Sequence, residues 1–432
     1  MVIKRHNSLT FALFVQVSGV FYKVDNMMRN KLLILLLISC SCTPSSTEEY
    51  FGKLQQGVPI VDDGSVKNIK LISETVIGDN KEVVLGSLSR IEVDSAGRIY
   101  VADRLQNQIH VFGENGDYIT SLGREGVGPG EFQGFTHMKI TGNRLSVFDR
   151  MQFRINEFDL KNLSYSNSVS VRQYPRNAEE HESILRWFPM YFIPRYDGTT
   201  LAGYMEHPKD SRIELETYNL GEYRRVKYYF MNYSGEIISD QLFEVRDRED
   251  LMATVDGMHL SRVQPAAFLG NSILRLSPQK EIILVWTKDF IIKVYDSNGN
   301  YERALYHADH SKRIIRREEL IEFLYEDDWN NQLLVKHAEL PEKWPSIFTI
   351  EIDDENRIWV GVIKDGEQFL EWWVITQQGD LVAKAYLPGD LSLKWLMSDP
   401  LILIKDGYLY ASKRNSDSGQ EVVVKYKLKV VE

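Results

Sequence analysis

The feature that most constrains the fold is a strand-and-turn pattern that recurs along the chain. In residues 90–122, apolar and polar side chains alternate on both sides of a turn at 95–97, as in two strands joined by a tight turn. Two further strands, at 109–112 and 118–122, follow and are separated by another glycine-containing turn. Four short strands in roughly 40 residues are typical of one blade of a β-propeller.

Similar segments recur after this first copy. They span residues 138–169, 190–243, 272–305, 348–386 and 401–430. The last copy has only three evident strands, and residues 68–77 form a candidate strand ahead of the first copy. Because a propeller must close its ring, we predict that this N-terminal strand completes the last blade. The sequence therefore predicts an all-β, six-bladed propeller of four-stranded blades over residues 68–432. A pair of β-sandwiches, the alternative, fits the regular period poorly.

Two of the copies carry a motif that resembles a known repeat. Residues 91–103 (IEVDSAGRIYVAD) with Asn107-Gln108-Ile109, and residues 352–360 (IDDENRIWV), resemble the NHL repeat. Residues 123–132 (GREGVGPGEF) resemble the blade junction of six-bladed β-propeller lipoproteins related to NHL proteins. The resemblance extends over residues 68–430 and implies the propeller fold. It implies little about function, because propellers serve as binding modules, lyases and hydrolases alike.

The N-terminal region carries a targeting signal. A basic segment, residues 27–31, precedes the apolar run 32–38, which is far shorter than the about 20 residues that span a bilayer and suits a secretory signal. The run ends in Leu37-Ile38-Ser39-Cys40, which resembles a bacterial lipobox with an acylated cysteine. An ordinary cleavable signal is the alternative. We favour lipidation of Cys40, because the only two cysteines of the chain, Cys40 and Cys42, lie at this junction.

These signals divide the chain into three parts. We interpret residues 1–39 as leader and lipoprotein signal peptide, with 1–26 an extension from a start codon assigned too early. Residues 40–67 form a lipid-anchored tether, and the propeller follows. The sequence thus predicts a cell-envelope protein, periplasmic or on the outer surface, which contacts a bacterial membrane only through its anchor. The formal net charge of −10 argues against nucleic acid as a partner.

Strand order predicts where the long loops lie. In a four-stranded blade, the loops between the second and third strands and the connections between blades share one face, named here the long-loop face. The turns of the opposite face are tight, whereas the connections exceed the usual roughly 4 to 6 residues. The longest connection has a helical pattern at 316–334, so we predict one helical insertion between blades four and five. Since long loops on rigid scaffolds commonly carry function, we expect recognition on this face.

The candidate binding residues lie in these loops, around the mouth of the central channel. Arginines gathered there can bind a carboxylate, a phosphate or an acidic peptide through paired hydrogen bonds. Ion pairing between blades is the competing interpretation for each one. The candidates are Arg104, Gln106, Arg124, Glu131, Arg150, Gln152, Arg154, Arg262, Lys288 and Trp344.

Motifs for catalysis are lacking in the sequence. It has no Gly-x-Ser-x-Gly elbow, phosphate loop or calcium loop. His307 and His310 have a spacing that can suit a metal, but we interpret them as loop residues. We therefore predict no catalytic residue, metal or cofactor. The predicted function is a lipid-anchored binding or interaction module for an unidentified protein or small molecule. The alternatives are a propeller lyase or hydrolase, metal-assisted or not, and a structural subunit of an envelope complex.

Overall fold

The computed structural model divides the chain into two compact units, Met1–Leu54 and Gln55–Glu432. It describes residues 14–17, 20–23, 56–79, 82–171, 177, 187–206, 225–262, 267–308, 313–324, 329–364, 370–386, 401–414 and 419–431. In the first unit these form one hairpin of β1 (Phe14–Val17) and β2 (Val20–Lys23). The predicted apolar signal run, Cys40 and the first part of the predicted tether lie outside the described residues.

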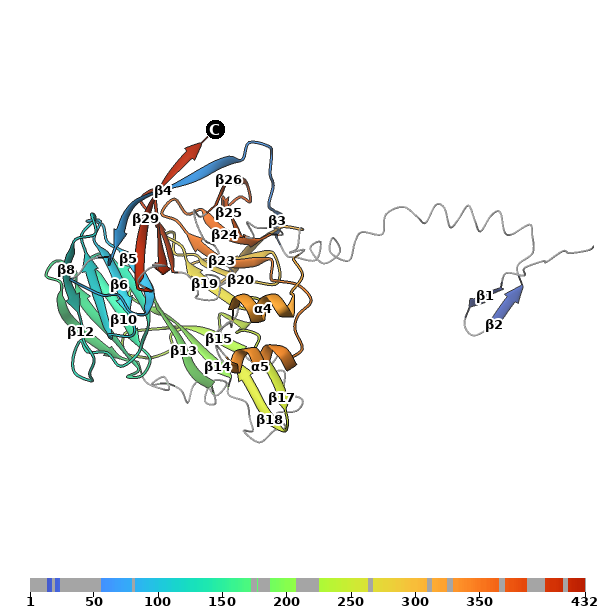
Figure 1. Cartoon of the computed structure of the whole chain (residues 1–432), viewed down its shortest axis with the longest axis horizontal. Helices are drawn as coiled ribbons and strands as arrows, with labels where there is room; N and C mark the ends of the chain where they lie inside the picture. The colour runs from blue at the N-terminus through green and yellow to red at the C-terminus, as the bar shows by residue number, and fades with distance from the viewer. Residues whose placement is uncertain are drawn as a thin grey trace, which may run out of the picture. The chain divides into compact units, whose positions relative to one another are not determined.

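The larger unit is built mainly of antiparallel sheets arranged in a ring (Figure 1). The first blade contains β5 (Leu88–Val93), β6 (Ile99–Asp103), β7 (Gln108–Phe112) and β8 (Tyr118–Leu122). The second contains β9 (Phe135–Thr141), β10 (Arg144–Asp149), β11 (Arg154–Asp159) and β12 (Ser164–Ser170). The third contains β13 (Trp187–Pro194), β14 (Thr200–Glu206), β15 (Arg225–Met231) and β16 (Phe243–Arg246). Each blade coincides with one predicted sequence copy.

The fourth and fifth blades follow the same order. The fourth contains β19 (Ser272–Leu276), β20 (Ile282–Trp286), β21 (Ile291–Tyr295) and β22 (Tyr301–Tyr306). The fifth contains β23 (Ile347–Ile352), β24 (Ile358–Ile363), β25 (Leu370–Ile375) and β26 (Leu381–Ala385). A short strand that the sequence pattern did not predict, β3 (Gly57–Pro59), pairs in parallel with β22 and widens the fourth blade to five strands.

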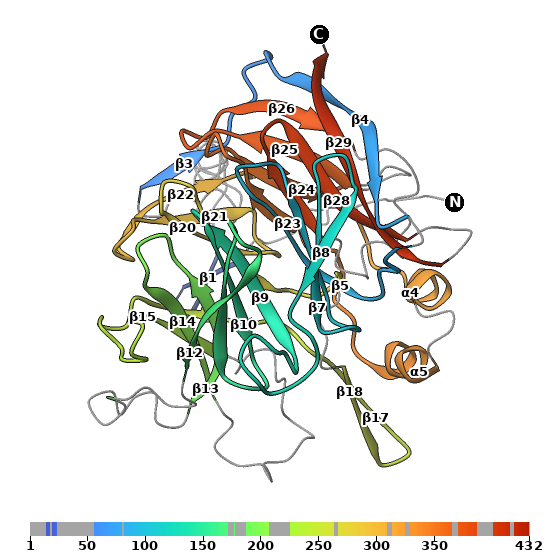
Figure 2. The ribbon, with the colours of Figure 1, turned by 90° about the vertical axis from the view of Figure 1, so that its left-hand side faces the viewer.

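The sixth blade is completed by the N-terminal strand, as predicted. Its own strands are β27 (Ile402–Lys405), β28 (Tyr408–Arg414) and β29 (Glu421–Val431). The outer strand, β4 (Lys67–Ile77), pairs antiparallel with β29, and its first residues also pair in parallel with β26. Figure 2 shows β4 along the outer side of β29. One segment thus joins the fifth blade to the sixth, and β27 contacts β5 of the first blade.

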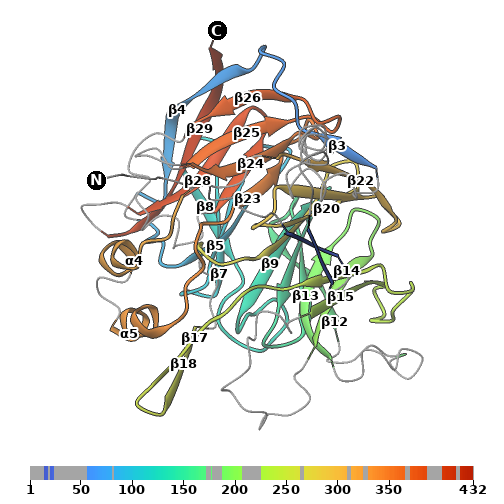
Figure 3. The ribbon, with the colours of Figure 1, turned by 90° about the vertical axis from the view of Figure 1, so that its right-hand side faces the viewer.

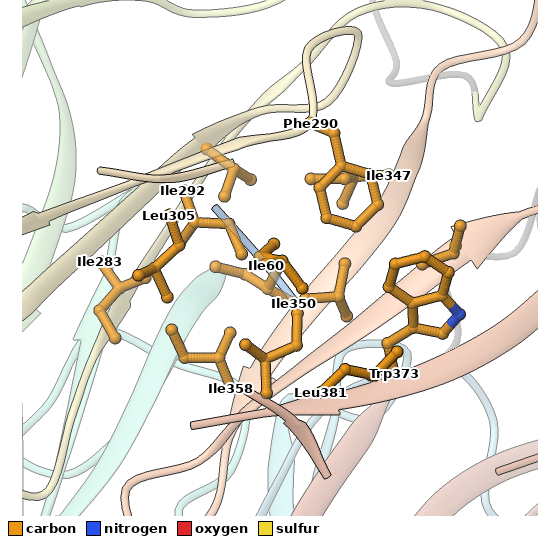
Figure 4. Packing of buried hydrophobic residues seen from close by; sticks show 14 of the residues in the cluster. Ile60, Ile283, Phe290, Ile292, Leu305, Ile347, Ile350, Ile358, Trp373 and Leu381 are labelled. Atoms are coloured by element: carbon orange, nitrogen blue, oxygen red, sulfur yellow. The ribbon is translucent and has the colours of Figure 1, made fainter. Parts of the chain in front are cut away.

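Apolar clusters fill the spaces between neighbouring blades. Successive side chains of a strand point to opposite faces, and each blade has a neighbour on both faces, so central strands such as β6 are buried along their whole length. The cluster between the fourth and fifth blades contains Phe290, Ile350 and Trp373 (Figure 4). Corresponding clusters lie between the other blades, including Ile77, Ile91 and Val423 between the sixth and the first.

Two insertions pack together on the long-loop face. A hairpin of β17 (Leu251–Val255) and β18 (Met258–Arg262) follows the third blade, and the helices α4 (Arg317–Leu324) and α5 (Trp329–His337) follow the fourth. Helix α5 contacts both hairpin strands (Figure 3). We name these four elements the cap. The predicted helical insertion is confirmed, although it holds two helices where one was expected. Among the described residues, no helix is long and apolar enough to cross a membrane.

Candidate functional site

The loops between the second and third strands of blades one and two are built alike. Asp103 ends β6 and is fully buried; its carboxylate accepts hydrogen bonds from the backbone N–H groups of Leu105 (2.9 Å) and Gly86 (2.6 Å). Asp149 ends β10 and accepts from Met151 (2.9 Å) and Gln133 (2.7 Å) in the same way. Each aspartate therefore ties its loop to the connection that enters the blade, which makes the loop rigid.

Each of these loops presents an arginine and an apolar side chain to solvent. Arg104 and Arg150 are exposed, and within the described part of the chain neither guanidinium has a hydrogen-bond or ion-pair partner. Their neighbours Leu105 and Met151 are 74% and 67% exposed. Two valines of the connections, Val84 and Val127, are 62% and 67% exposed. We name this set the arginine–apolar patch: Val84, Arg104, Leu105, Val127, Arg150 and Met151.

Hydrogen bonds from other predicted residues hold the valines of the patch beside its loops. The side-chain amide of Gln106 donates to the carbonyl of Val84 (2.5 Å). The amide of Gln152 donates to the carbonyl of Gly126 (2.9 Å), and the guanidinium of Arg154 to that of Val127 (3.3 Å). These three predicted residues thus hold the patch in place. The two glutamine amides also donate to the loop aspartates Asp103 and Asp149.

Arg124 and Glu131 form an ion pair within the connection between blades one and two. The Arg124 Nε and the Glu131 Oε1 lie 2.7 Å apart, and the Arg124 side chain is 75% exposed. A hydrogen bond from the Gly128 N–H (2.7 Å) and the Arg124 guanidinium hold the pKa of Glu131 below its usual value. The pair shapes the loop and leaves part of the guanidinium open to solvent.

The remaining predicted residues lie at or beside the cap. The Lys288 ammonium donates to the Glu249 carboxylate (2.6 Å). The Trp344 side chain is not at a channel mouth, because it is buried in the apolar core of the cap, edge-on to Phe268. Arg262 ends β18, and its side chain lies outside the described residues. Of the ten candidates, the structure therefore leaves Arg104 and Arg150 best placed for a ligand.

The sequence interpretation missed a group of charged residues on the innermost strands. Lys139 on β9 pairs with Glu92 on β5 (3.3 Å), and Arg275 on β19 pairs with Glu351 on β23 (2.7 Å). His137 on β9 lies edge-on to the ring of Tyr191 on β13. We name these residues, with Arg90 on β5, the central cluster. The sequence signal that could have revealed this cluster is the presence of charged residues in the first strand of each predicted blade, which borders the ring centre.

Burial and two positive charges act on His137. Burial, followed by the charges of Arg90 and Arg275, lowers the pKa of His137 to about 3. In contrast, the Glu92 carboxylate raises the pKa of Lys139. The imidazole is therefore neutral at neutral pH, whereas the lysine keeps its charge. Arg90, His137 and Arg275 belong to blades one, two and four, so residues of three blades determine the protonation state of this imidazole.

Ser121, His110 and Asp103 have the side-chain types of a hydrolase triad but not its geometry. The Ser121 Oγ lies 2.7 Å from the His110 Nδ1, yet the His110 Nε2 is 4.0 Å from the Asp103 carboxylate, beyond hydrogen-bond distance. His110 is 1% exposed and Asp103 already binds loop backbone. We interpret this set as structural.

The described residues show no group of three or more His, Cys, Asp or Glu side chains that could hold a metal ion. His307, one half of the histidine pair considered above, packs against the rings of Phe290 and Trp373. His310 lies outside the described residues.

Comparison with protein families agrees with the propeller fold. A family model described as a 6-bladed beta-propeller (DUF5128) matches residues 74–239. No curated protein matches the sequence.

Several solved structures are similar at low sequence identity. A member of the DUF4221 family from Bacteroides vulgatus is 11% identical with a TM-score of 0.48, and the match covers 84% of this chain and 99% of that chain. A candidate exported protein from Bacteroides fragilis is 11% identical with a TM-score of 0.46, over 87% and 99%. Regucalcin, a calcium-binding protein from Agrobacterium tumefaciens, is 12% identical with a TM-score of 0.38, over 87% and 97%.

Proposed function

We propose that this protein is a lipid-anchored, extracytoplasmic binding module whose arginine–apolar patch recognises a segment of a partner protein. The observation that carries the proposal is the repetition of the patch on two adjacent blades. In both, a buried aspartate fixes the loop while an arginine and a large apolar side chain face solvent. The extracytoplasmic location rests on the signal-like segment that ends at Cys40.

The composition of the patch indicates the chemistry of its partner. Fully burying an aliphatic side chain of this size contributes about 1.5–3 kcal/mol, so Leu105 and Met151 can anchor apolar side chains of a partner. The guanidinium groups of Arg104 and Arg150 suit carboxylates, with which arginine forms two parallel hydrogen bonds. Since the loops are already fixed, little conformational entropy is lost on binding. The expected partner is a segment in which apolar residues are interspersed with Asp or Glu.

Selection from a displayed peptide library tests this proposal. The wild-type protein is expected to enrich peptides that combine acidic and apolar residues. The double variants Arg104→Glu/Arg150→Glu and Leu105→Ser/Met151→Ser should lose at least tenfold in affinity for a selected peptide. Lys161→Glu, in a turn of the opposite face, and Ile119→Ser, on the outer strand of blade one, are the matched controls. Equal loss in the controls, or no loss in the patch variants, would refute the proposal.

A further inference from the structure

A positively charged face lies on the two strands that close the ring, β4 and β29. The strands pair antiparallel, so that Lys429 lies directly opposite Lys70, with Lys427 two residues away on β29. Leu71, the next residue of β4, points to the other side and packs in the apolar cluster between the fifth and sixth blades. Because paired residues share one face of a sheet and neighbours alternate, Lys70, Lys427 and Lys429 share the face turned away from that cluster. We name these three residues the lysine face.

The lysine face is open to solvent and largely without counter-charges. All three side chains are exposed, and within the described part of the chain neither Lys70 nor Lys429 has a hydrogen-bond or ion-pair partner. Lys427 is 57% exposed and lies 3.8 Å from the carboxylate of Glu74. Ile72, which pairs with Lys427, is 39% exposed. Like charges directly opposite one another destabilise a strand pair, so the fold gains nothing from placing Lys429 against Lys70.

The surroundings of the lysine face add little negative charge. Glu74 offsets one of its three positive charges. Asp62, on the segment before β4, lies 3.6 Å from the ammonium of Lys384 on β26. Glu432 follows β29 in the sequence and lies outside the described residues. The face is thus positive in a chain whose formal net charge is −10, and such a local excess attracts anions.

We propose that the lysine face binds the anionic headgroups of a lipid membrane. Lysine carries a compact charge on a flexible stem, which suits phosphates that are spread over a surface. The exposed Ile72 can enter the boundary between headgroups and acyl chains. β4 follows the N-terminal segment with the proposed anchor, and a tether raises the effective concentration of lipid at the residues that follow it. This contact goes beyond the function proposed above and extends the prediction that only the anchor touches the membrane.

Protection of the sheet edge is the competing explanation for these lysines. Charged side chains on an edge strand prevent pairing with strands of other molecules, and either sign of charge serves this purpose. Reversal of charge therefore separates the two explanations. The variant Lys70→Glu/Lys429→Glu keeps a charged edge, whereas its attraction to anionic lipid becomes a repulsion.

Lysine acetylation, measured by mass spectrometry, tests the proposal. The probes are vesicles of phosphatidylcholine with or without phosphatidylglycerol, and the protein is the full chain with Cys40→Ser, which removes the proposed lipid. We expect vesicles that contain phosphatidylglycerol to reduce acetylation of the lysine face at least fivefold, and vesicles of phosphatidylcholine alone to leave it unchanged. Lys161 and Lys280, exposed in turns of blades two and four, are the matched controls and should react equally with both kinds of vesicle.

Charge-reversal variants complete the test. In Lys70→Glu/Lys429→Glu, Lys427 should lose its protection, whereas in Lys161→Glu/Lys280→Glu it should keep it. Both variants should bind a peptide selected by the wild type as the wild type does, which separates this contact from the arginine–apolar patch. Equal acetylation of the lysine face with both kinds of vesicle, equal protection of Lys161 and Lys280, or the same protection by soluble glycerophosphoglycerol would overturn the proposal.

Discussion

Replacing Ile77 by alanine tests whether the N-terminal strand closes the ring. Ile77 is the last residue of β4, is fully buried, and lies in the cluster between the sixth and first blades. The substitution removes three carbon atoms, which costs about 2.4 kcal/mol at about 0.8 kcal/mol per methylene. The cavity left behind brings the expected loss to about 3–4 kcal/mol. On the same strand, Ile72 is 39% exposed, and Ile72→Ala should cost less than about 1 kcal/mol.

Urea unfolding of both variants measures this difference, and hydrogen exchange locates it. The Ile77→Ala midpoint should fall well below those of the wild type and Ile72→Ala. Amides of β29 that pair with β4 should exchange faster in Ile77→Ala, because the outer strand detaches more often. Equal midpoints for the two variants, with unchanged exchange in β29, would show that closure by β4 does not stabilise the ring and would refute the reasoning.

Three further predictions concern other parts of the molecule. Asp103→Ala should lower the free energy of unfolding, measured in urea, by several kcal/mol. The reason is that buried backbone N–H groups lose a charged acceptor, and each such loss costs about 1–3 kcal/mol. A decrease of under about 1 kcal/mol would contradict the role of Asp103 in holding the loop. The pKa of His137 is about 3 in the folded protein, below its ordinary value of 6.5. Above about pH 6.5 the imidazole is neutral in both the folded and the unfolded chain and does not change the free energy of unfolding with pH. Between pH 6.5 and pH 3 only the unfolded chain takes up the proton, so the free energy of unfolding falls by up to about 1.4 kcal/mol per pH unit. His137→Gln should flatten the stability profile there, and an unchanged profile would exclude this effect. Cys40→Ser should abolish a lipid-sized mass increment on the N-terminal peptide, whereas Cys42→Ser should retain it.

The blades were predictable because their signals are local. The turn at 94–98 illustrates this: the Asp94 carboxylate accepts from the backbone N–H of Ala96 and Arg98 and from the Arg98 side chain. Asp353 binds the backbone and side chain of Arg357 in the same way, so an Asp with an Arg four residues later indicates the turn in both copies. The closing strand was predictable because the last copy lacked one strand.

Contacts between distant segments were not predictable from such patterns. The β17–β18 hairpin is stabilised by α5, which lies far along the chain. Trp344 is buried against Phe268 across the same interface. The sequence around the tryptophan does not predict this contact. Likewise, strand alternation predicts which face of its strand His137 occupies, but it does not predict that Arg275 from another blade lowers the pKa of His137.

The loop of the fourth blade shows that this loop geometry does not require an exposed apolar side chain. There Trp286 stands at the position of Asp103 and Asp149, and the next residue, Thr287, accepts a hydrogen bond from the Asn271 N–H through its hydroxyl (2.9 Å). The position of Leu105 and Met151 is occupied by Lys288, whose ammonium donates to the Glu249 carboxylate (2.6 Å). In the fourth blade, the loop is therefore bonded to the preceding connection without an exposed apolar side chain. Leu105 and Met151 face solvent although the loop does not require it, and exposed apolar side chains of this kind suit the contact with a partner that we propose.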